Sequence, residues 1–371
     1  MYFGLSEEQK SLEENIKRYL AENAPLDKIK AVANGDDGEA DSVHKGIIEL
    51  GLSGLLVPEQ YGGLELNMLF ATVVSAALGS GTAPVPYVGS YVMAPLALNL
   101  AGSEEQKNKW LPKIAAGECQ FGVGLSEYVG AREDAGFEFS NGKINGRSLF
   151  LIDGKNADGF ILSDKSGGLY VIDSKTSGIE IVELTTVDKT RTSIEILLKN
   201  VNAELLEGSK DKSVIEKVLD AGRLMLAADT VGAAQVMLDK SVAYSLERKQ
   251  FGRLIGSFQA VKHMLADVAV AIEFAKPAVY RAAYSLFESN PKSALHCAHA
   301  KYMCSQAAEL ACKNSIQAHG AMGYTWEMDL HIYMRKAWSM MACWGNEDRQ
   351  QDIIFKTLSS STEELGVMYT F

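Results

Sequence analysis

The sequence lacks the features that would place it in several common classes of protein. Acidic residues outnumber basic ones by 47 to 36, which gives a formal net charge of −11, so nucleic acid and anionic membrane surfaces are poor candidates for its main partner. Apolar runs stay below the ~18 residues that a membrane-spanning helix requires. The first residues lack the basic flank of a secretory signal. We therefore expect a cytoplasmic protein that binds neither nucleic acid nor membrane.

Cysteine is scarce as well, and its placement does not indicate a function. The five cysteines are odd in number and do not show the spacing of a metal site, which favours reduced thiols and no bound metal. The remaining composition is ordinary for a soluble globular protein, with 47% hydrophobic and 22% charged residues. A chain of 371 residues is too long for one small core and predicts two or three packed units.

Helical patterns fill the first region, residues 1–117. Ser6, followed three residues later by Gln9, predicts a capping box at the start of a helix, and the segment Ser103–Gln106 opens another capped helix. Glycines and prolines between residues 51 and 63 indicate a loop-rich passage. We predict an N-terminal helical domain.

The pattern changes to strands in the second region, residues 118–210. Apolar and polar residues alternate in short runs that are separated by Gly, Asn, Asp and Ser. Spacers long enough for helices are missing between these runs, which favours an antiparallel barrel or sandwich over a sheet of βαβ units. The predicted strands include residues 137–140, 169–172, 179–182 and 193–197. We predict a middle antiparallel β-barrel domain.

Helical periodicity returns in the third region, residues 211–371. The apolar residues between 218 and 237 cover much of a helix surface, as expected for a helix buried inside a bundle. Two more long helices are predicted at residues 255–288 and 294–319, followed by a shorter one. Pro277 should kink or break the first of these two. The whole chain is therefore predicted to be an α+β protein that ends in a four-helix bundle.

Two motifs in the third region carry the most specific signal. Arg248 has a permanent charge and a planar fork suited to a diphosphate, although a solvated cation at a helix end would look the same from spacing alone. Phe251 offers an apolar face near a nucleotide, and Gln317 can hydrogen-bond a ligand. The full segments, Tyr244–Gly252 and Gln317–Tyr324, resemble hallmarks of acyl-CoA dehydrogenases. Their spacing and the α–β–α order also match, so the resemblance covers nearly the whole chain.

This resemblance implies the acyl-CoA dehydrogenase fold, FAD as cofactor, an acyl-CoA substrate and an electron-accepting flavoprotein as partner. In the family, the two motifs hold the ADP half of the FAD that a neighbouring subunit binds, so an oligomer is implied. The residues that match this ADP cradle are Arg248, Gln250, Phe251, Gln259, Gln317, Gly320 and Ala321.

The chain's own flavin site matches the family less well. Leu125 and Ser126 resemble the start of a Leu-Thr-Glu-Pro run whose hydroxyl and amides meet the isoalloxazine ring, and Ser126 keeps the hydroxyl. Tyr128 replaces the proline. The segment that begins at Phe150 stands in place of a Trp-Ile-Thr-Asn pattern; Phe150 can pack on a ring, but Ile152 cannot donate the hydrogen bond of the threonine. The resemblance thus predicts a weakened flavin site in this chain.

The catalytic base of the family has no acidic counterpart in this sequence. The family's reaction removes an α-proton and transfers a hydride from Cβ to the flavin, and its glutamate base occupies one of two places. One place corresponds to Trp344 and the other to Gly222. An indole nitrogen is a donor only, so Trp344 cannot act as a base, and its bulk should obstruct the acyl channel. Glu347 is a conceivable relocated base, but residues 346–351 predict a solvated polar loop.

Two charged residues on the first helix of the bundle match a position beside the substrate. The resemblance places Arg223 near the thioester and CoA end, with Asp220 as its structural neighbour. The residues alone allow an exposed helix surface with a salt bridge instead. Both interpretations stay open.

Three functional hypotheses follow. The segment Gly323–Tyr333 resembles a branch that includes sterol-degrading α2β2 dehydrogenases, in which a base-less subunit pairs with an active one. The first hypothesis is therefore one subunit of a heterotetramer acting on a bulky acyl-CoA such as a steroid side-chain thioester. The second is a self-sufficient flavoenzyme that uses Glu347 or another carboxylate, or carries out other flavin chemistry. The third is an acyl-CoA-binding or scaffolding protein without flavin, against which the joint presence of Arg248, Phe251 and Gln317 speaks.

Overall fold

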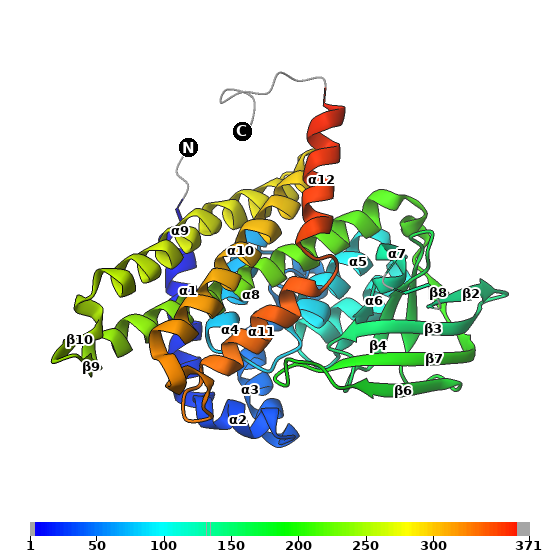
Figure 1. The fold of residues 1–371 in the computed structure, drawn as a ribbon. Coiled ribbons are helices and arrows are strands. Elements are labelled where there is room, and N and C mark those ends of the chain that lie inside the picture. Colours follow the sequence, from blue (N-terminus) through cyan, green and yellow to red (C-terminus); the bar gives the residue numbers. More distant parts are fainter. Residues whose placement is uncertain (1–3, 131, 134, 362–371) are drawn as a thin grey trace.

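Helices occupy both ends of the chain and a sheet occupies the middle (Figure 1). The computed structural model describes residues 4–130, 132–133 and 135–361. The helices of the first region are α1 (Glu7–Asn23), α2 (Leu26–Ala33), α3 (Asp37–Glu49), α4 (Met68–Ser80), the π-helical η3 (Tyr87–Met93), α5 (Ala94–Ala101) and α6 (Glu104–Ala115). Both predicted capping boxes are confirmed: Ser6 and Gln9 bond reciprocally at the start of α1, and Ser103 and Gln106 do so at α6.

The middle region is an open sheet. Its elements are β1 (Phe121–Gly124), the short α7 (Ser126–Val129), β2 (Gly136–Ser140), β3 (Lys143–Ile152), β4 (Gly159–Ser163), β5 (Leu169–Asp173), β6 (Ile179–Leu184), β7 (Ser193–Asn202) and β8 (Glu204–Leu205). The strands lie in the order β6-β7-β3-β1-β4-β5-β8, with β2 paired to β3. Within the described residues β6 and β8 do not pair, so the predicted closed barrel is wrong.

One strand pair also departs from the predicted antiparallel pattern. β1 and β4 run parallel, whereas the other pairs of this sheet are antiparallel. The chain leaves β1 and returns through the β2–β3 hairpin, which places β3 on one edge of β1. The next strand, β4, therefore takes the other edge and runs in the same direction as β1.

The third region is built around one long central helix. Its elements are α8 (Lys212–Glu247), the hairpin strands β9 (Lys249–Gln250) and β10 (Arg253–Leu254), α9 (Gln259–Phe287), α10 (Ser293–His319), α11 (Leu330–Ala342) and α12 (Glu347–Ser360). α8 packs against α4, α9, α10 and α11, which explains why apolar residues cover much of its surface. The predicted helical bundle is thus confirmed.

Pro277 does not break its helix. α9 continues through it to Phe287, so of the predicted kink or break, the break is wrong. Proline lacks one N–H and so forfeits a single helical hydrogen bond. Because α9 packs on both α8 and α10, tertiary contacts hold the two halves together. None of the described helices combines the length and the apolar character that crossing a membrane demands.

Burial of a histidine makes the fold sensitive to acid. His44 on α3 is 7% exposed, with Nε2 2.6 Å from the Tyr91 hydroxyl and Nδ1 3.3 Å from Nε2 of Gln120. Burial lowers the pKa of His44 to about 4. The unfolded chain, whose histidine pKa is about 6.5, therefore binds more protons between these two values. The stabilisation present above pH 6.5 is lost as the pH falls toward the folded pKa.

We expect the titration of His44 to lower the free energy of unfolding by up to about 3 kcal/mol as the pH falls from neutrality to about 4. Denaturant unfolding of the wild type and of His44→Gln, measured across this range, checks the expectation, because the substitution should flatten the pH dependence. His263→Gln, at an exposed position of α9, is the control. Equal pH slopes for wild type and His44→Gln would contradict the prediction.

Candidate active site

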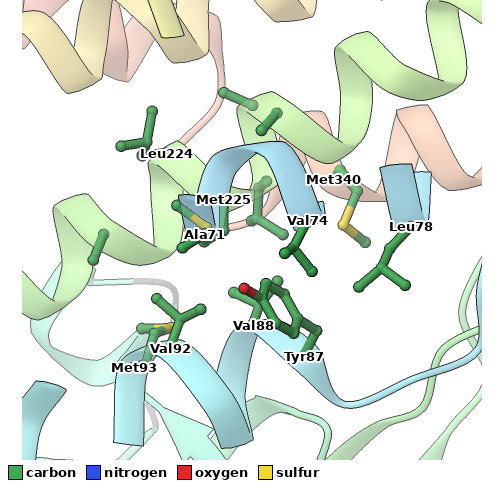
Figure 2. Packing of buried hydrophobic residues seen from close by; sticks show 14 of the residues in the cluster. Ala71, Val74, Leu78, Tyr87, Val88, Val92, Met93, Leu224, Met225 and Met340 are labelled. Carbon is green, nitrogen blue, oxygen red and sulfur yellow. The ribbon is translucent and has the colours of Figure 1, made fainter. Parts of the chain in front are cut away.

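The two positions without a base lie against each other. Trp344 follows α11 and is buried, and its indole covers Gly222 of α8: a Cβ added to Gly222 would lie 2.7 Å from Cζ3 of Trp344 and 2.7 Å from Sδ of Met93. Real Cβ contacts under 3.0 Å are essentially never seen, so a side chain at residue 222 requires the indole and Met93 to move. Figure 2 shows buried apolar side chains packed between α4, η3 and α8, among them Val74, Met93 and Leu224.

Arg223 and Asp220 hold the turn that carries Trp344. Nε of Arg223 donates to the carbonyl oxygen of Trp344 at 3.0 Å, and Nη1 of Arg223 lies 3.1 Å from Oδ1 of Asp220. Both side chains are buried. The interpretation of these residues as an exposed helix surface is therefore wrong, although they do form a salt bridge. Burial raises the pKa of Asp220 to about 6, against the opposing effect of Arg223. The pair fixes the backbone beside the indole.

Lys301 fixes the same turn from the other side, and sequence reasoning missed it. Its buried Nζ on α10 donates to the carbonyl oxygens of Met340 at 2.5 Å and Met341 at 3.3 Å, at the C-terminal end of α11. A cation at this end of a helix is stabilised by the helix dipole, and burial lowers the pKa of Lys301 to about 8. Lys301 is spaced from Cys297 and Cys304 so that all three lie on the same buried face of α10. This spacing is the signal in the sequence that could have identified Lys301 as a buried residue.

A cavity of about 600 Å³ opens between the sheet and the C-terminal helices. Phe150 near the end of β3 and Trp344 give it aromatic surface, and Ser126 at the start of α7 also lines it. Leu125 is fully buried and is not among the lining residues in the described part of the chain. The structure thus brings Ser126, Phe150 and Ile152 together with Trp344, as their places in the sequence resemblance require.

Buried charges at one wall of this cavity join the three regions of the chain. Arg191, in the loop before β7, lies 3.9 Å from Asp153 and 3.8 Å from Asp229 of α8. Asp153 accepts the N–H of Gly89 in η3 at 2.9 Å, and Lys336 of α11 lies 3.3 Å from Asp229. Burial raises the pKa of Asp153, while Arg191 opposes that shift. These residues are far apart in the sequence, so no local pattern marks them.

The predicted ADP cradle lies at the opposite end of the molecule from the sheet (Figure 1). Arg248 and Phe251 belong to the β9–β10 hairpin region after α8, and the ring of Tyr244 stacks on His319 at a centroid distance of 4.3 Å, which joins this region to the end of α10 and Gln317. All seven cradle residues are exposed, Phe251 by 91%. In the described structure none of the seven lines the 600 Å³ cavity.

Comparison with known proteins decides the family. The model of the acyl-CoA dehydrogenase N-terminal domain matches residues 6–118, and that of the acyl-CoA dehydrogenase C-terminal domain matches residues 212–359. A probable acyl-CoA dehydrogenase, YngJ of Bacillus subtilis (strain 168), is 32% identical, with 96% of this chain and 100% of YngJ covered. The chain belongs to the acyl-CoA dehydrogenase family.

Solved structures agree with this assignment. The glutaryl-coenzyme A dehydrogenase–glutaryl-CoA complex aligns with a TM-score of 0.86 at 25% identity, covering 97% of this chain and 98% of that one. A chain of the ChsE4–ChsE5 complex from Mycobacterium tuberculosis shares the fold, with a TM-score of 0.87 at 21% identity over 98% of this chain and 100% of that one. The acyl-CoA dehydrogenase fold predicted from the motifs is confirmed. Members of this family bind FAD, and the assignment supports an oxidoreductase that acts on acyl-CoA.

The residues that line the cavity of this member of the acyl-CoA dehydrogenase family fit the ring half of FAD. Its volume lies within the range typical of small-molecule sites. Phe150 and Trp344 offer apolar faces to a planar ring, Ser126 offers a hydroxyl, and Nε1 of the Trp344 indole is buried and has no hydrogen-bond partner among the described residues. When bound, FAD supplies the hydride acceptor of the family's reaction. The residues of this chain would position the ring and exclude water from it.

Glu347 does not face this cavity. It begins α12, which Asn346 caps, so the predicted solvated polar loop is wrong. Oε2 of Glu347 accepts a hydrogen bond from the amide of Gln306 on α10, and burial raises the pKa of the carboxyl. Asn346 and Arg349 line the cavity, whereas Glu347 is not among its lining residues in the described chain. The carboxyl that could replace the base is therefore directed toward a neighbouring helix.

Proposed function

We propose that this chain is a non-catalytic subunit of a heteromeric acyl-CoA dehydrogenase that introduces an α,β double bond into an acyl-CoA thioester. The observation that carries the proposal is the packing of Trp344 on Gly222. One indole occupies the space at both base positions, and a carboxylate cannot stand at residue 222 while the indole and Met93 keep their places. The catalytic base would come from the partner subunit.

The separation of the cavity and the ADP cradle supports this role. FAD has a ring half and an ADP half; the proposed cradle residues do not line the cavity in the described structure, and they lie by the β9–β10 hairpin, at the end of the molecule away from the sheet (Figure 1). Arg248 has the fixed charge and planar fork that suit the diphosphate of a partner's FAD, and Tyr244 and His319 join it to Gln317. The chain would therefore contribute an ADP cradle and half of an oligomer interface.

Two resemblances indicate the partners. A chain from a complex of two differently named proteins, ChsE4 and ChsE5, has this fold, which is consistent with an α2β2 heterotetramer. The segment Gly323–Tyr333 resembles sterol-degrading members of the family, so a steroid side-chain thioester is the proposed substrate. An electron-accepting flavoprotein would reoxidise the reduced cofactor.

Co-expression with the acyl-CoA dehydrogenase encoded by a neighbouring gene tests the proposal. We expect the two chains to purify as one complex that oxidises acyl-CoA with an artificial electron acceptor, while the lone chain shows no turnover. Mass measurement of the intact complex gives the subunit ratio. Turnover by the lone chain at the rate of the complex would overturn the proposal.

Arg248→Ala should weaken FAD binding by the complex about 10- to 100-fold in Kd, because a charge-assisted hydrogen bond contributes about 1.5–3 kcal/mol. Arg253→Ala is the matched control: Arg253 is an exposed arginine of the same hairpin whose guanidinium stacks over Phe258 at 4.0 Å. Titration of the FAD-free complexes with FAD measures both constants. Equal losses for the two variants would argue against a role for Arg248 in holding the diphosphate.

The alternative is a self-sufficient flavoenzyme whose base has moved to Glu347. Because its carboxylate bonds Gln306, we expect Glu347→Gln to change turnover of the complex less than about twofold, whereas loss of a general base costs about 10²- to 10⁴-fold. Steady-state kinetics distinguish these outcomes. A loss of that size in a correctly folded variant would make Glu347 the base.

A further inference from the structure

A smaller hollow lies where α2, the β6–β7 loop and the start of α11 meet. Its volume is about 350 Å³. Lys30 of α2 lies 2.6 Å from Asp329, the residue just before α11, and this salt bridge joins two of the three elements (Figure 1). In the described structure the hollow shares only Asp188 with the 600 Å³ cavity, and none of the seven cradle residues lines it. It is therefore a site separate from both.

The hollow is positively charged, although the protein is acidic. In the described chain three cations line it against one carboxylate: Lys30, Lys189 and Arg335 against Asp188. The whole chain, by contrast, carries a net charge of −11. Oδ1 of Asp188 accepts from N and Oγ1 of Thr190 at 2.8 Å and 2.7 Å, so this carboxylate is engaged within its own loop. Because clefts lined by one sign of charge attract the opposite sign, the hollow favours an anion.

Two of these cations are available to a ligand. Lys30 is engaged by Asp329, whereas neither Lys189 nor Arg335 forms a salt bridge with any other described residue. Positive charge also acts on the histidine of the lining: burial first, and then Arg335 and Lys30, lower the pKa of His331, while Asp329 opposes them. An anion in the hollow would relieve this crowding of cations.

An exposed aromatic ring forms one side of the hollow. Trp326 is 68% exposed and belongs to the lining. Two neighbours hold its indole: Cζ of Arg335 lies 5.3 Å from the ring centroid, and the ring of His331 meets it edge-on with the centroids 4.5 Å apart. An aromatic ring that is held in place and still exposed offers a surface on which a planar group can stack.

We propose that this hollow binds a mononucleotide, whose base stacks on Trp326 and whose phosphate is held by Lys189 and Arg335. The guanidinium of arginine has the planar fork that suits a phosphate, and a volume of about 350 Å³ lies within the range of small-molecule sites. The proposal does not depend on the subunit role, because these residues belong neither to the cradle nor to the two base positions.

Calorimetric titration of the full-length chain with AMP tests the proposal. We expect one AMP per chain, and at least about tenfold weaker binding of adenosine, which lacks the phosphate, and of inorganic phosphate, which lacks the ring. Lys189→Met and Trp326→Leu change exposed side chains, so both variants should fold, and each should weaken AMP binding about five- to tenfold. Trp338→Leu is the matched control on α11, because Trp338 is 47% exposed and lies outside the lining.

One more pair of variants separates this hollow from the ADP cradle, whose chemistry also suits AMP. Arg335→Met should weaken AMP binding as Lys189→Met does, whereas Arg248→Ala should leave it unchanged. The proposal is overturned if the wild-type chain does not bind AMP, if adenosine binds as tightly as AMP, or if Arg248→Ala abolishes binding while Lys189→Met does not. The titration uses the lone chain, so its result is independent of the co-expression experiment.

Discussion

Replacing Trp344 by alanine should lower the free energy of unfolding by about 3–5 kcal/mol. The indole is 3% exposed and lies over Gly222 and Met93. Alanine at residue 344 therefore leaves a void, and Gly222 has no side chain that could fill it. Denaturant unfolding followed by circular dichroism measures the loss. Trp338→Ala is the control, because Trp338 on α11 is 47% exposed and should cost less than about 1 kcal/mol. Similar losses for the two tryptophans would argue against the packing described.

The same contact predicts that residues 344 and 222 are energetically coupled. Gly222→Ala in the wild type forces a Cβ to within 2.7 Å of Trp344 and Met93 and should cost about 1–3 kcal/mol. After Trp344→Ala the added methyl group has space, so the double variant should be more stable than the sum of losses predicts, by about 1–2 kcal/mol. Strict additivity would show that the indole does not rest on Gly222.

Replacing Arg191 by methionine should cost about 3–5 kcal/mol, because removal of one partner leaves buried carboxylates uncompensated. Arg191 lies 3.9 Å from Asp153 and 3.8 Å from Asp229, and Lys336 lies 3.3 Å from Asp229. Loss of Arg191 should raise the pKa of Asp153 further, because this arginine opposes the effect of burial.

The stability deficit of Arg191→Met should therefore shrink as the pH falls and Asp153 takes up a proton. Denaturant unfolding at neutral and mildly acidic pH measures both effects. Arg253→Met changes an exposed arginine and should cost less than about 0.5 kcal/mol at either pH. A deficit for Arg191→Met that grows on acidification would show that the carboxylates are not its partners.

Local signals in the sequence were sufficient for much of the fold. The capping boxes at Ser6 and Ser103 needed only a hydroxyl and a glutamine three residues apart, and the alternating pattern located β2, β6 and β7. β1, β3 and β4 were not predicted; every residue of β1 and β4 is buried, whereas β5, whose residues 169–172 are also buried, was recognised from its apolar run. A strand covered on both faces shows no alternation, and without β1 and β4 neither the parallel pair nor the open sheet order could be foreseen.

The site was predictable in its residue types but not in its contacts. The family motifs located Trp344 and Gly222, yet only the three-dimensional packing places one on the other. Asp220 and Arg223, three residues apart on a helix, look the same in the sequence whether the pair is exposed or buried. Asn346 followed by acidic residues was a helix start that the prediction of a polar loop overlooked. Arg191 and its partners meet only through the tertiary fold.

An FAD molecule held as proposed would contact the cavity of one chain and the exposed cradle of another, because the cradle residues do not line the cavity in the described structure and lie at the end of the chain away from the sheet (Figure 1). Cofactor binding and subunit association then form one linked equilibrium: the cofactor favours the assembled state by mass action, and dilution of the protein releases it. Flavin content would report how many chains are assembled. A cell that made the two kinds of chain in unequal amounts would lose cofactor from the whole complex, and the chain without a base would thereby control the activity of the chain that has one.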